Sequence, residues 1–378
     1  MIRNTLRNAT ILAGMAGALA LGVPAASAQT ATPAPAAAAS QPMAQPAPEM
    51  KSVLDELTAL GAKPIGTLSV KETRTQPSPA DAVMAIMKDQ NIEPPAAVQA
   101  VKSRDIQIPG GAGEIAARVY TPQGEGPFPL VVYYHGGGWV IADLDTYDAS
   151  PRALSAGAKA VVVSVDYRHA PEQKFPAAHE DAFAAYKWIV ENSGSLNADA
   201  TRIAVAGESA GGNLAANVAI MARDAKITQP IHQLLVYPVA GNDMNTPSYI
   251  ENAEAQPLSK QGMMWFVENV FASKDQTSDP RLNLVGRDDL QGLPAATVIN
   301  AQIDPLRSEG EALAANLKSA GVAVEQKTYS GVTHEFFGMG TVVPQAKEAM
   351  DMAGQRLAAA FAEAGTSGES TSSTKPAN

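Results

Sequence analysis

A serine set between glycines is the first feature of this sequence that could carry chemistry. Residues 207–211 read Gly-Glu-Ser-Ala-Gly and match the pattern G-x-S-x-G, with Ser209 at the centre. The motif follows the apolar run 203–206 and opens an alanine-rich segment, so we expect a sharp turn between a strand and a helix. Such a turn lifts the serine hydroxyl clear of the backbone, and the helix N-terminus stabilises negative charge that develops there. The motif predicts a nucleophile for acyl transfer, with a glycine-rich turn that has no chemistry as the alternative.

A second glycine-rich motif, His-Gly-Gly-Gly-Trp at residues 135–139, follows the apolar run 130–134. Glycine has no Cβ, so its backbone N–H can approach a ligand closely, and acyl transfer needs such donors aimed at the developing oxyanion. We expect His135 to hold this loop in place. The expected oxyanion donors are Gly137, Gly138 and Ala210, with Gly136 as a substitute.

The general base can be found by elimination among the five histidines of the chain. In proteins with this nucleophile turn the chain order is serine, acid, histidine, which leaves His232 and His334. His232 opens an apolar strand and is typical of a satisfied residue at the edge of a sheet. His334 lies beyond the last predicted strand and is therefore the candidate base. Asp304, just past the apolar run 296–300, is the candidate acid.

The three residues imply a two-step reaction. His334 would take the proton of Ser209 and return it to the leaving alcohol, while Asp304 holds the imidazole in the required tautomer. Water would then attack the acyl-enzyme, again through the histidine. This chemistry needs no metal and no cofactor, so we expect neither, and the expected partner is a small-molecule ester.

The elements that must position these residues are visible as an alternating pattern. Short runs rich in valine and isoleucine lie at residues 130–134, 160–165, 203–206, 234–237 and 296–300, with helical patterns between them. Continuous apolar runs suit parallel strands that are buried on both faces, so the alternation predicts an α/β protein. We assign residues 101–364 to this catalytic domain. Amphipathic segments in 51–100 predict helices that form an N-terminal cap, and the polar insertion 241–290, with a helix near 260–271, is expected to contribute to that cap.

The N-terminus has the pattern of an export signal. Arg3 and Arg7 precede an apolar run at 11–23, and Ala26-Ser27-Ala28 is a small-residue cleavage site. We predict a signal peptide over 1–28 and a periplasmic or secreted protein. A membrane anchor is the alternative, but the run is shorter than the ~20 residues that span a bilayer. Residues 29–50, rich in alanine and proline, predict a flexible linker, and 365–378 a disordered tail.

Composition excludes several classes of partner. The chain has no cysteine, so disulfides and thiol catalysis are excluded. Its formal net charge of −10 and pI near 5.1 argue against nucleic acid and anionic membranes. No integral membrane segment is expected after signal cleavage. A monomer and a homodimer stay open.

From about residue 57 to 357 the sequence resembles the hormone-sensitive-lipase-like carboxylesterases, called bacterial esterase family IV. The resemblance rests on motifs at 135–139, 166–172, 175–178, 207–213, 304–307 and 334–336. It implies an α/β-hydrolase fold with an eight-stranded, mostly parallel sheet, a helical N-terminal cap, and hydrolysis of short- to medium-chain acyl esters. A deacetylase, an amidase, a lipase and a non-catalytic binding protein on the same fold are the alternatives.

Four positions depart from the family pattern. Aspartate is usual at Glu208 and often stands at Ser308, leucine is usual at His169, and glycine often stands at Glu335. Glu208 adjoins the nucleophile, and we expect it to shape the substrate pocket together with Trp139. The resemblance further implies that Asp166, Arg168 and Glu172 form a structural charge network.

Overall fold

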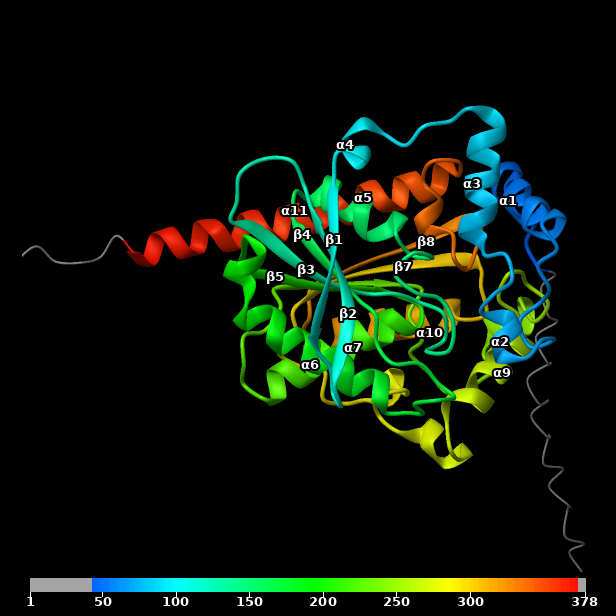
Figure 1. Ribbon diagram of the computed structural model, residues 1–378. Coiled ribbons are helices and arrows are strands. Elements are labelled where there is room, and N and C mark those ends of the chain that lie inside the picture. Colours follow the sequence, from blue (N-terminus) through cyan, green and yellow to red (C-terminus); the bar gives the residue numbers. More distant parts are fainter. Residues whose placement is uncertain (1–42, 373–378) are drawn as a thin grey trace, which may run out of the picture. The chain divides into compact units, whose positions relative to one another are not determined.

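A computed structural model describes residues 43–372 of the chain, with side chains to residue 365. The predicted signal peptide and residues 29–42 of the predicted linker lie outside the described residues. One eight-stranded sheet organises the rest (Figure 1). Its strands are β1 (Lys102–Pro109), β2 (Glu114–Thr121), β3 (Phe128–Tyr134), β4 (Val161–Val165), β5 (Ala198–Glu208), β6 (His232–Val236), β7 (Ala295–Ile303) and β8 (Val324–Thr333).

The strand order places the ends of the central strands together. The order is β1-β2-β4-β3-β5-β6-β7-β8, with β2 antiparallel to both of its neighbours, β1 and β4, and all other pairs parallel. The chain crosses over between β4 and β5, which lie on opposite sides of β3. In parallel sheets ligands bind at the carboxyl ends of the strands near such a reversal. The predicted α/β-hydrolase fold with a mostly parallel eight-stranded sheet is confirmed.

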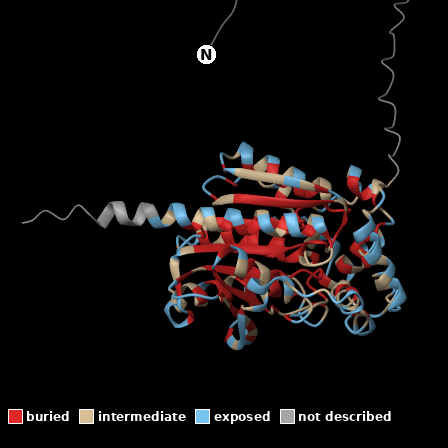
Figure 2. Cartoon of the chain, turned by 90° about the horizontal axis from the view of Figure 1, so that it is seen from above, coloured by how far each residue is buried: buried red, intermediate tan, exposed pale blue. Residues whose placement is uncertain are grey.

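Helices cover both faces of the sheet (Figure 1). On one face lie α5 (Ala149–Ala158) and α11 (Pro344–Ser372). On the other lie α6 (Ala177–Glu191), α7 (Ala210–Asp224) and α10 (Arg307–Ser319). Figure 2 shows that the strands are buried between these layers, while the outer surface of α11 is exposed. Alternate residues of β3 therefore enter different cores, with Val132 on the α6–α7 side and Val131 on the α5–α11 side.

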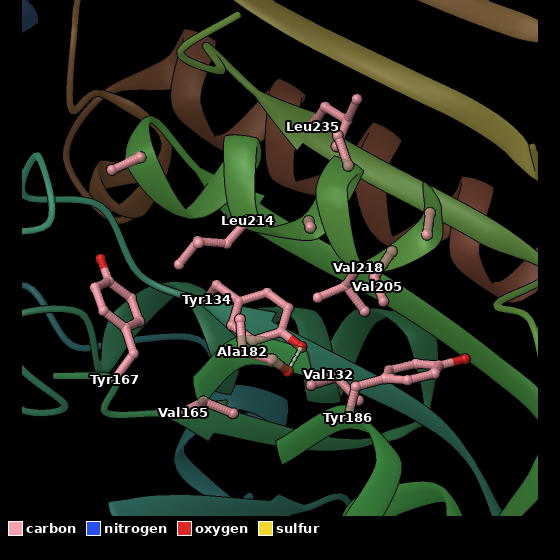
Figure 3. Close-up of a cluster of buried hydrophobic side chains, with 14 of the residues drawn as sticks. Val132, Tyr134, Val165, Tyr167, Ala182, Tyr186, Val205, Leu214, Val218 and Leu235 are labelled. Atoms are coloured by element: carbon pink, nitrogen blue, oxygen red, sulfur yellow. Dashed lines mark hydrogen bonds between the residues drawn. The ribbon is translucent and has the colours of Figure 1, made fainter. Parts of the chain in front are cut away.

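The core on the α6–α7 side holds the segment that carries Ser209. Val205 of β5 and Leu214 of α7 belong to the same buried cluster as Tyr134 of β3 (Figure 3). The Tyr134 hydroxyl donates a 2.9 Å hydrogen bond to the carbonyl of Ala182, which satisfies its polar end inside this core. Burying an aliphatic side chain such as that of Val205 or Leu214 stabilises the folded state by about 1.5–3 kcal/mol. The turn between β5 and α7 is thus fixed by packing on both sides.

The segment before the sheet is helical, as predicted. It contains α1 (Pro48–Ala59), α2 (Val70–Thr73), α3 (Pro79–Gln90) and α4 (Ala96–Gln99). In Figure 1 the first three lie at the end of the sheet together with α9 (Lys260–Val270) of the insertion. The short α4 lies beside α5 instead, so the capping helices are α1 to α3. The insertion also contains α8 (Pro247–Glu251), η2 (Lys274–Ser278) and η3 (Leu284–Gly286), and the remaining short helices are η1 (Ser193–Leu196) and η4 (Phe337–Met339).

Two predicted boundaries are wrong. The linker ends before residue 50, because the Ala47 N–H donates to the Gly331 carbonyl at 2.7 Å and Met50 is fully buried. The predicted disordered tail is helical over 365–372, where α11 continues. The alanine-rich turns of α11 that precede residue 365 favour helix. Adding residues to an existing helix also avoids the cost of helix nucleation. No helix in the part of the chain that the structure describes is both long and apolar enough to cross a membrane.

Candidate active site

Ser209 lies in a strained turn between β5 and α7. Its backbone has φ +56° and ψ −118°, a region that L-residues rarely adopt. The Ser209 N–H donates to the Val236 carbonyl at 2.9 Å, and the Ser209 carbonyl accepts from the Val239 N–H at 3.1 Å. A Cβ at Gly207 would lie 2.1 Å from the Gly211 carbonyl oxygen, so only glycine allows this close approach. The predicted nucleophile turn is present.

His334 and Asp304 complete a hydrogen-bonded chain with the serine. His334 Nε2 lies 2.9 Å from Ser209 Oγ, and His334 Nδ1 lies 2.7 Å from Asp304 Oδ2. Asp304 follows β7 and His334 follows β8, so neighbouring parallel strands deliver both side chains to one edge of the sheet. The other carboxylate oxygen, Asp304 Oδ1, accepts the Leu306 N–H at 2.8 Å. All three side chains are buried, which fixes the geometry before any substrate binds.

The charges around His334 favour its protonated form. Burial alone lowers the pKa of the imidazole, but the nearby carboxylate of Asp304, followed by Glu335 and Glu208, raises it more, so the net pKa lies above its usual value. The Tyr237 ring packs on the imidazole with ring centroids 4.4 Å apart. The imidazolium that forms when Ser209 loses its proton is therefore stabilised.

The glycine-rich loop 136–138 stands beside Ser209. Gly137 and Gly138 have φ of +88° and +59°, and both line the same cavity as the serine. An added Cβ would lie 2.2 Å from the Ile141 carbonyl oxygen at Gly137 and 2.2 Å from the Phe266 ring at Gly138. Ala210 is the first residue of α7, where the helix leaves the backbone N–H without a partner. Gly136 does not line the cavity, and its carbonyl accepts from the Tyr167 hydroxyl at 3.0 Å.

A cavity of about 890 Å³ opens above these residues. Ser209 and His334 form part of its wall, as does Trp139, in agreement with the prediction for that residue. The cap and the insertion supply most of the rest with apolar side chains, which are Leu54, Leu57, Ile65, Met244, Leu258, Met263, Phe266, Val267 and Phe271. The arrangement offers an apolar group a bounded space next to a serine, a base and backbone donors.

Comparison with known proteins agrees with this geometry. Residues 131–338, more than half of the chain, match the model of a protein family described as having the alpha/beta hydrolase fold. The chain belongs to this α/β-hydrolase family. Carboxylesterase NlhH of Mycobacterium tuberculosis is 44% identical over 244 residues, which cover 63% of this chain and 76% of that relative. Ethyl acetate hydrolase of Pseudomonas putida is 35% identical over 248 residues, covering 64% and 78%. A solved esterase of Pyrobaculum calidifontis superposes with a TM-score of 0.71 at 40% identity, covering 78% of this chain and 94% of that one.

In this α/β-hydrolase Glu208 does not line the substrate cavity, so the prediction that it does is wrong. Its side chain is 1% exposed at the end of β5, and its partners Tyr133 and Tyr237 belong to the buried cluster on the α5–α11 side of the sheet. The hydroxyls of Tyr133, at 2.6 Å, and Tyr237 donate to its two carboxylate oxygens. Burial raises its pKa to about 7 despite these hydrogen bonds.

Glu335 takes a place in the active site of this α/β-hydrolase that sequence reasoning did not assign. It lines the cavity, its Oε1 lies 3.9 Å from His334 Nε2, and the Tyr147 hydroxyl donates to both of its carboxylate oxygens at 2.7 and 2.6 Å. Its φ of +71° lies in the left-handed region, which glycine adopts more readily than glutamate. The departure from the family pattern was the available signal.

Arg74 is a second residue that the sequence did not single out. From the end of α2 its guanidinium donates to the carbonyls of Val140 and Ala170 at 2.8 Å each, and it forms a two-pronged pair with Glu172. The cap is thereby tied to the loop that carries Gly137 and Gly138. The predicted charge network differs in its partners, because Arg168 pairs with Asp181 at 2.7 Å rather than with Glu172.

The remaining candidate base, His232, is not at the sheet edge but inside it. It begins β6, its Nε2 lies 2.9 Å from Thr297 Oγ1, and burial lowers its pKa to about 4. The ring is satisfied by this neighbour and does not line the substrate cavity.

Proposed function

We propose that this protein hydrolyses carboxylic esters with short to medium acyl chains through an acyl-enzyme on Ser209. The observation that carries the proposal is the unbroken chain of 2.9 and 2.7 Å hydrogen bonds from Ser209 through His334 to Asp304, at the wall of an apolar cavity. The carboxylesterase and ethyl acetate hydrolase among its relatives support an ester as the substrate.

The geometry assigns a role to each group. His334 Nε2 accepts the Ser209 proton as Oγ attacks the ester carbonyl, and Asp304 stabilises the resulting imidazolium. The N–H groups of Gly137, Gly138 and Ala210 are the donors for the oxyanion, since Gly137 and Gly138 line the same cavity as Ser209 and Ala210 is the next residue in the chain. The imidazolium then protonates the leaving alcohol, and a water molecule activated by the same nitrogen hydrolyses the acyl-enzyme.

The size and lining of the cavity favour small esters. A volume of about 890 Å³ is within the range of pockets that enclose small molecules. Residues from α1, α2 and α9 close it from above, so each methylene added to a long acyl chain must find space as well as apolar contact. This supports an esterase over a lipase that acts on long chains, while a deacetylase or an amidase uses the same residues and differs in the bond cleaved.

A non-catalytic binding protein on the same fold is the rival from another class. A binding role does not need a histidine in contact with the serine, whereas His334 is held within hydrogen-bond distance of Ser209 Oγ and its tautomer is fixed by Asp304. This favours an enzyme.

Turnover of p-nitrophenyl esters from acetate to palmitate tests the proposal. We expect highest kcat/KM at eight carbons or fewer, an organophosphate adduct on Ser209 alone, and a loss in kcat of about 10³-fold or more in folded Ser209→Ala. No turnover of any ester, or full activity in that variant, would refute it. His232→Asn, which changes a histidine away from the cavity, is the matched control and should keep the chemistry.

We also propose that the protein is exported and acts in the periplasm or outside the cell. The support is the pattern of Arg3, Arg7, the apolar run and the Ala28 cleavage site. Sequencing the N-terminus of protein made in a bacterial host should give Gln29, and a cytoplasmic product that begins at Met1 would contradict the proposal. The exclusion of nucleic acid stays a prediction from composition, and a monomer and a homodimer both stay open.

A further inference from the structure

A second cluster of chemically active side chains lies next to the active site but outside its cavity. It consists of His135, which follows β3, and Asp166 and His169, which follow β4. Their three ligand-type atoms all lie within 4.8 Å of one another, and none of the three residues lines the substrate cavity. The hydrolytic reaction uses none of them directly.

The hydrogen bonds of His135 determine which of its nitrogens is free. Its Nδ1 lies 2.9 Å from the Gly136 carbonyl oxygen, and because a carbonyl only accepts, Nδ1 carries the proton. Nε2 then presents a lone pair. This atom is fully buried, has no hydrogen-bond partner, and lies 3.8 Å from Asp166 Oδ1. Histidines that bind metals are held in the same way, with the second ring nitrogen bonded to a carbonyl or carboxylate.

His169 contributes a second ring nitrogen to the cluster. Its Nε2 is also buried without a hydrogen-bond partner, and its ring meets that of His135 edge-on with centroids 5.4 Å apart. The cluster thus gathers two unpartnered ring nitrogens and a carboxylate. A buried acceptor without a donor costs about 1–3 kcal/mol, so two unpartnered ring nitrogens beside a carboxylate favour a positive charge between them.

We propose that His135, Asp166 and His169 bind a divalent transition-metal cation, of which Zn²⁺ is the best match. Imidazole and carboxylate are ligands that Zn²⁺ prefers, and three protein ligands with one water complete a tetrahedral site. The edges of such a tetrahedron measure about 3.4 Å at ordinary zinc–ligand distances. The 3.8 Å between His135 Nε2 and Asp166 Oδ1 is close to this, and all three ligand atoms lie within 4.8 Å of one another, so small shifts of the side chains bring them to the distances of a zinc site.

The surrounding charges and rings suit this site. Arg74 is a positively charged residue that acts electrostatically on His169. Its guanidinium is already paired with the Glu172 carboxylate at 2.8 Å. Tyr167 stacks on the His135 ring at 4.4 Å, and its hydroxyl donates to the His135 carbonyl at 2.9 Å, so the buried ligand is preorganised. A bound ion would connect two loops, the one that carries residues 136–138 and the one that follows β4. Its role is structural, and it strengthens the loop that supplies the oxyanion donors.

Metal binding to the full exported chain, without a histidine tag and after treatment with a chelator, tests the site. Calorimetry with Zn²⁺ should show one ion per chain, Co²⁺ should give the visible absorption of a four-coordinate site, and Zn²⁺ should raise the midpoint of thermal unfolding. His169→Leu and Asp166→Asn should each weaken Zn²⁺ binding at least about tenfold. The second variant is nearly isosteric, so it keeps the test valid if the first does not fold.

His334→Ala is the matched control, because it removes the imidazole of the active site. Unchanged Zn²⁺ binding in that variant, together with weakened binding in the other two, supports the site. Zn²⁺ binding that is lost in His334→Ala but kept in His169→Leu would place the ion at the catalytic residues and overturn the proposal. Absence of Zn²⁺ binding by the wild type would also overturn it.

Discussion

Replacing Glu335 with glutamine tests whether a second carboxylate besides Asp304 controls the protonation of His334. Glutamine keeps the length of the side chain and an oxygen that accepts from Tyr147, so the backbone at φ +71° is not disturbed further. The variant removes a negative charge 3.9 Å from the nitrogen that must be unprotonated for catalysis. We therefore expect the pKa of His334 to fall.

The size of this effect follows from the distance. Two unit charges about 4 Å apart interact by about 1 kcal/mol in water and about 4 kcal/mol at the effective dielectric constant near a protein surface. The Glu335 side chain is 22% exposed and faces a cavity that water enters before substrate binds, which favours the lower part of that range. A value near 1.4 kcal/mol corresponds to about one pH unit.

The measurement is kcat/KM between pH 5 and 9 with an uncharged p-nitrophenyl ester at constant ionic strength. Activity needs neutral His334, so the rate falls as the pH decreases through the pKa of the free enzyme. In Glu335→Gln this acidic limb should move to lower pH by about one unit. Glu348→Gln, on the exposed surface of α11 beside Lys327, is the matched control and should not move it. A limb that stays in place, or moves to higher pH, refutes the electrostatic reasoning.

Three further predictions follow from packing and burial. Gly138→Ala places a methyl group against the Phe266 ring and should lower kcat/KM by about 10²–10³-fold in a folded protein; an added Phe266→Ala should restore part of the rate, and no recovery would rule out the clash as the cause. Burial raises the pKa of Glu309 to about 8, so the folded state holds a proton that the unfolded state releases above its ordinary pKa of about 4.5. As the pH rises from 4.5 to 7, this difference should lower the free energy of unfolding by about 3 kcal/mol. In denaturant titrations of Glu309→Gln, the free energy of unfolding should decrease less over the same pH range. Met50→Ala should cost about 2–5 kcal/mol because the side chain is fully buried, whereas Met84→Ala at an exposed site should leave the thermal midpoint almost unchanged.

The central strands could be predicted because their burial is complete. Every residue of β4 and β6 is buried, and each strand contains an apolar run, at 161–163 in β4 and 234–236 in β6. The edge strands gave no such signal. In β1 only Ile108 is fully buried, and β8 carries Glu325, Gln326 and Lys327 on its way to the catalytic histidine. Hydrophobic runs therefore reveal the middle of a sheet better than its edges.

The residues of the site also divide into those that the sequence could predict and those that it could not. Ser209, Asp304 and His334 could be chosen from motifs and chain order, since Ser209 and Asp304 lie just past predicted strands and His334 is the histidine that elimination leaves. The position of Glu208 could not, because adjacency to the nucleophile in sequence says nothing about which side of the strand a side chain faces. Arg74 contacts Val140 and Ala170, which are 66 and 96 residues away, so no local pattern indicates its role.

The anchoring of α1 has a consequence for the order in which the protein is assembled. The Thr333 hydroxyl donates to the sulfur of Met50 at 3.6 Å, across 283 positions of sequence, and the Ala47 N–H bonds to Gly331. During synthesis α1 is made early, but the strand that receives it is among the last parts to be produced. Contacts between such distant segments form late, because the loop between them must close first. A growing chain therefore carries an apolar helix without its partner, which is the condition in which chaperones engage a polypeptide. Ester hydrolysis and closure of the cap then begin together, since both wait for the segment that contains His334.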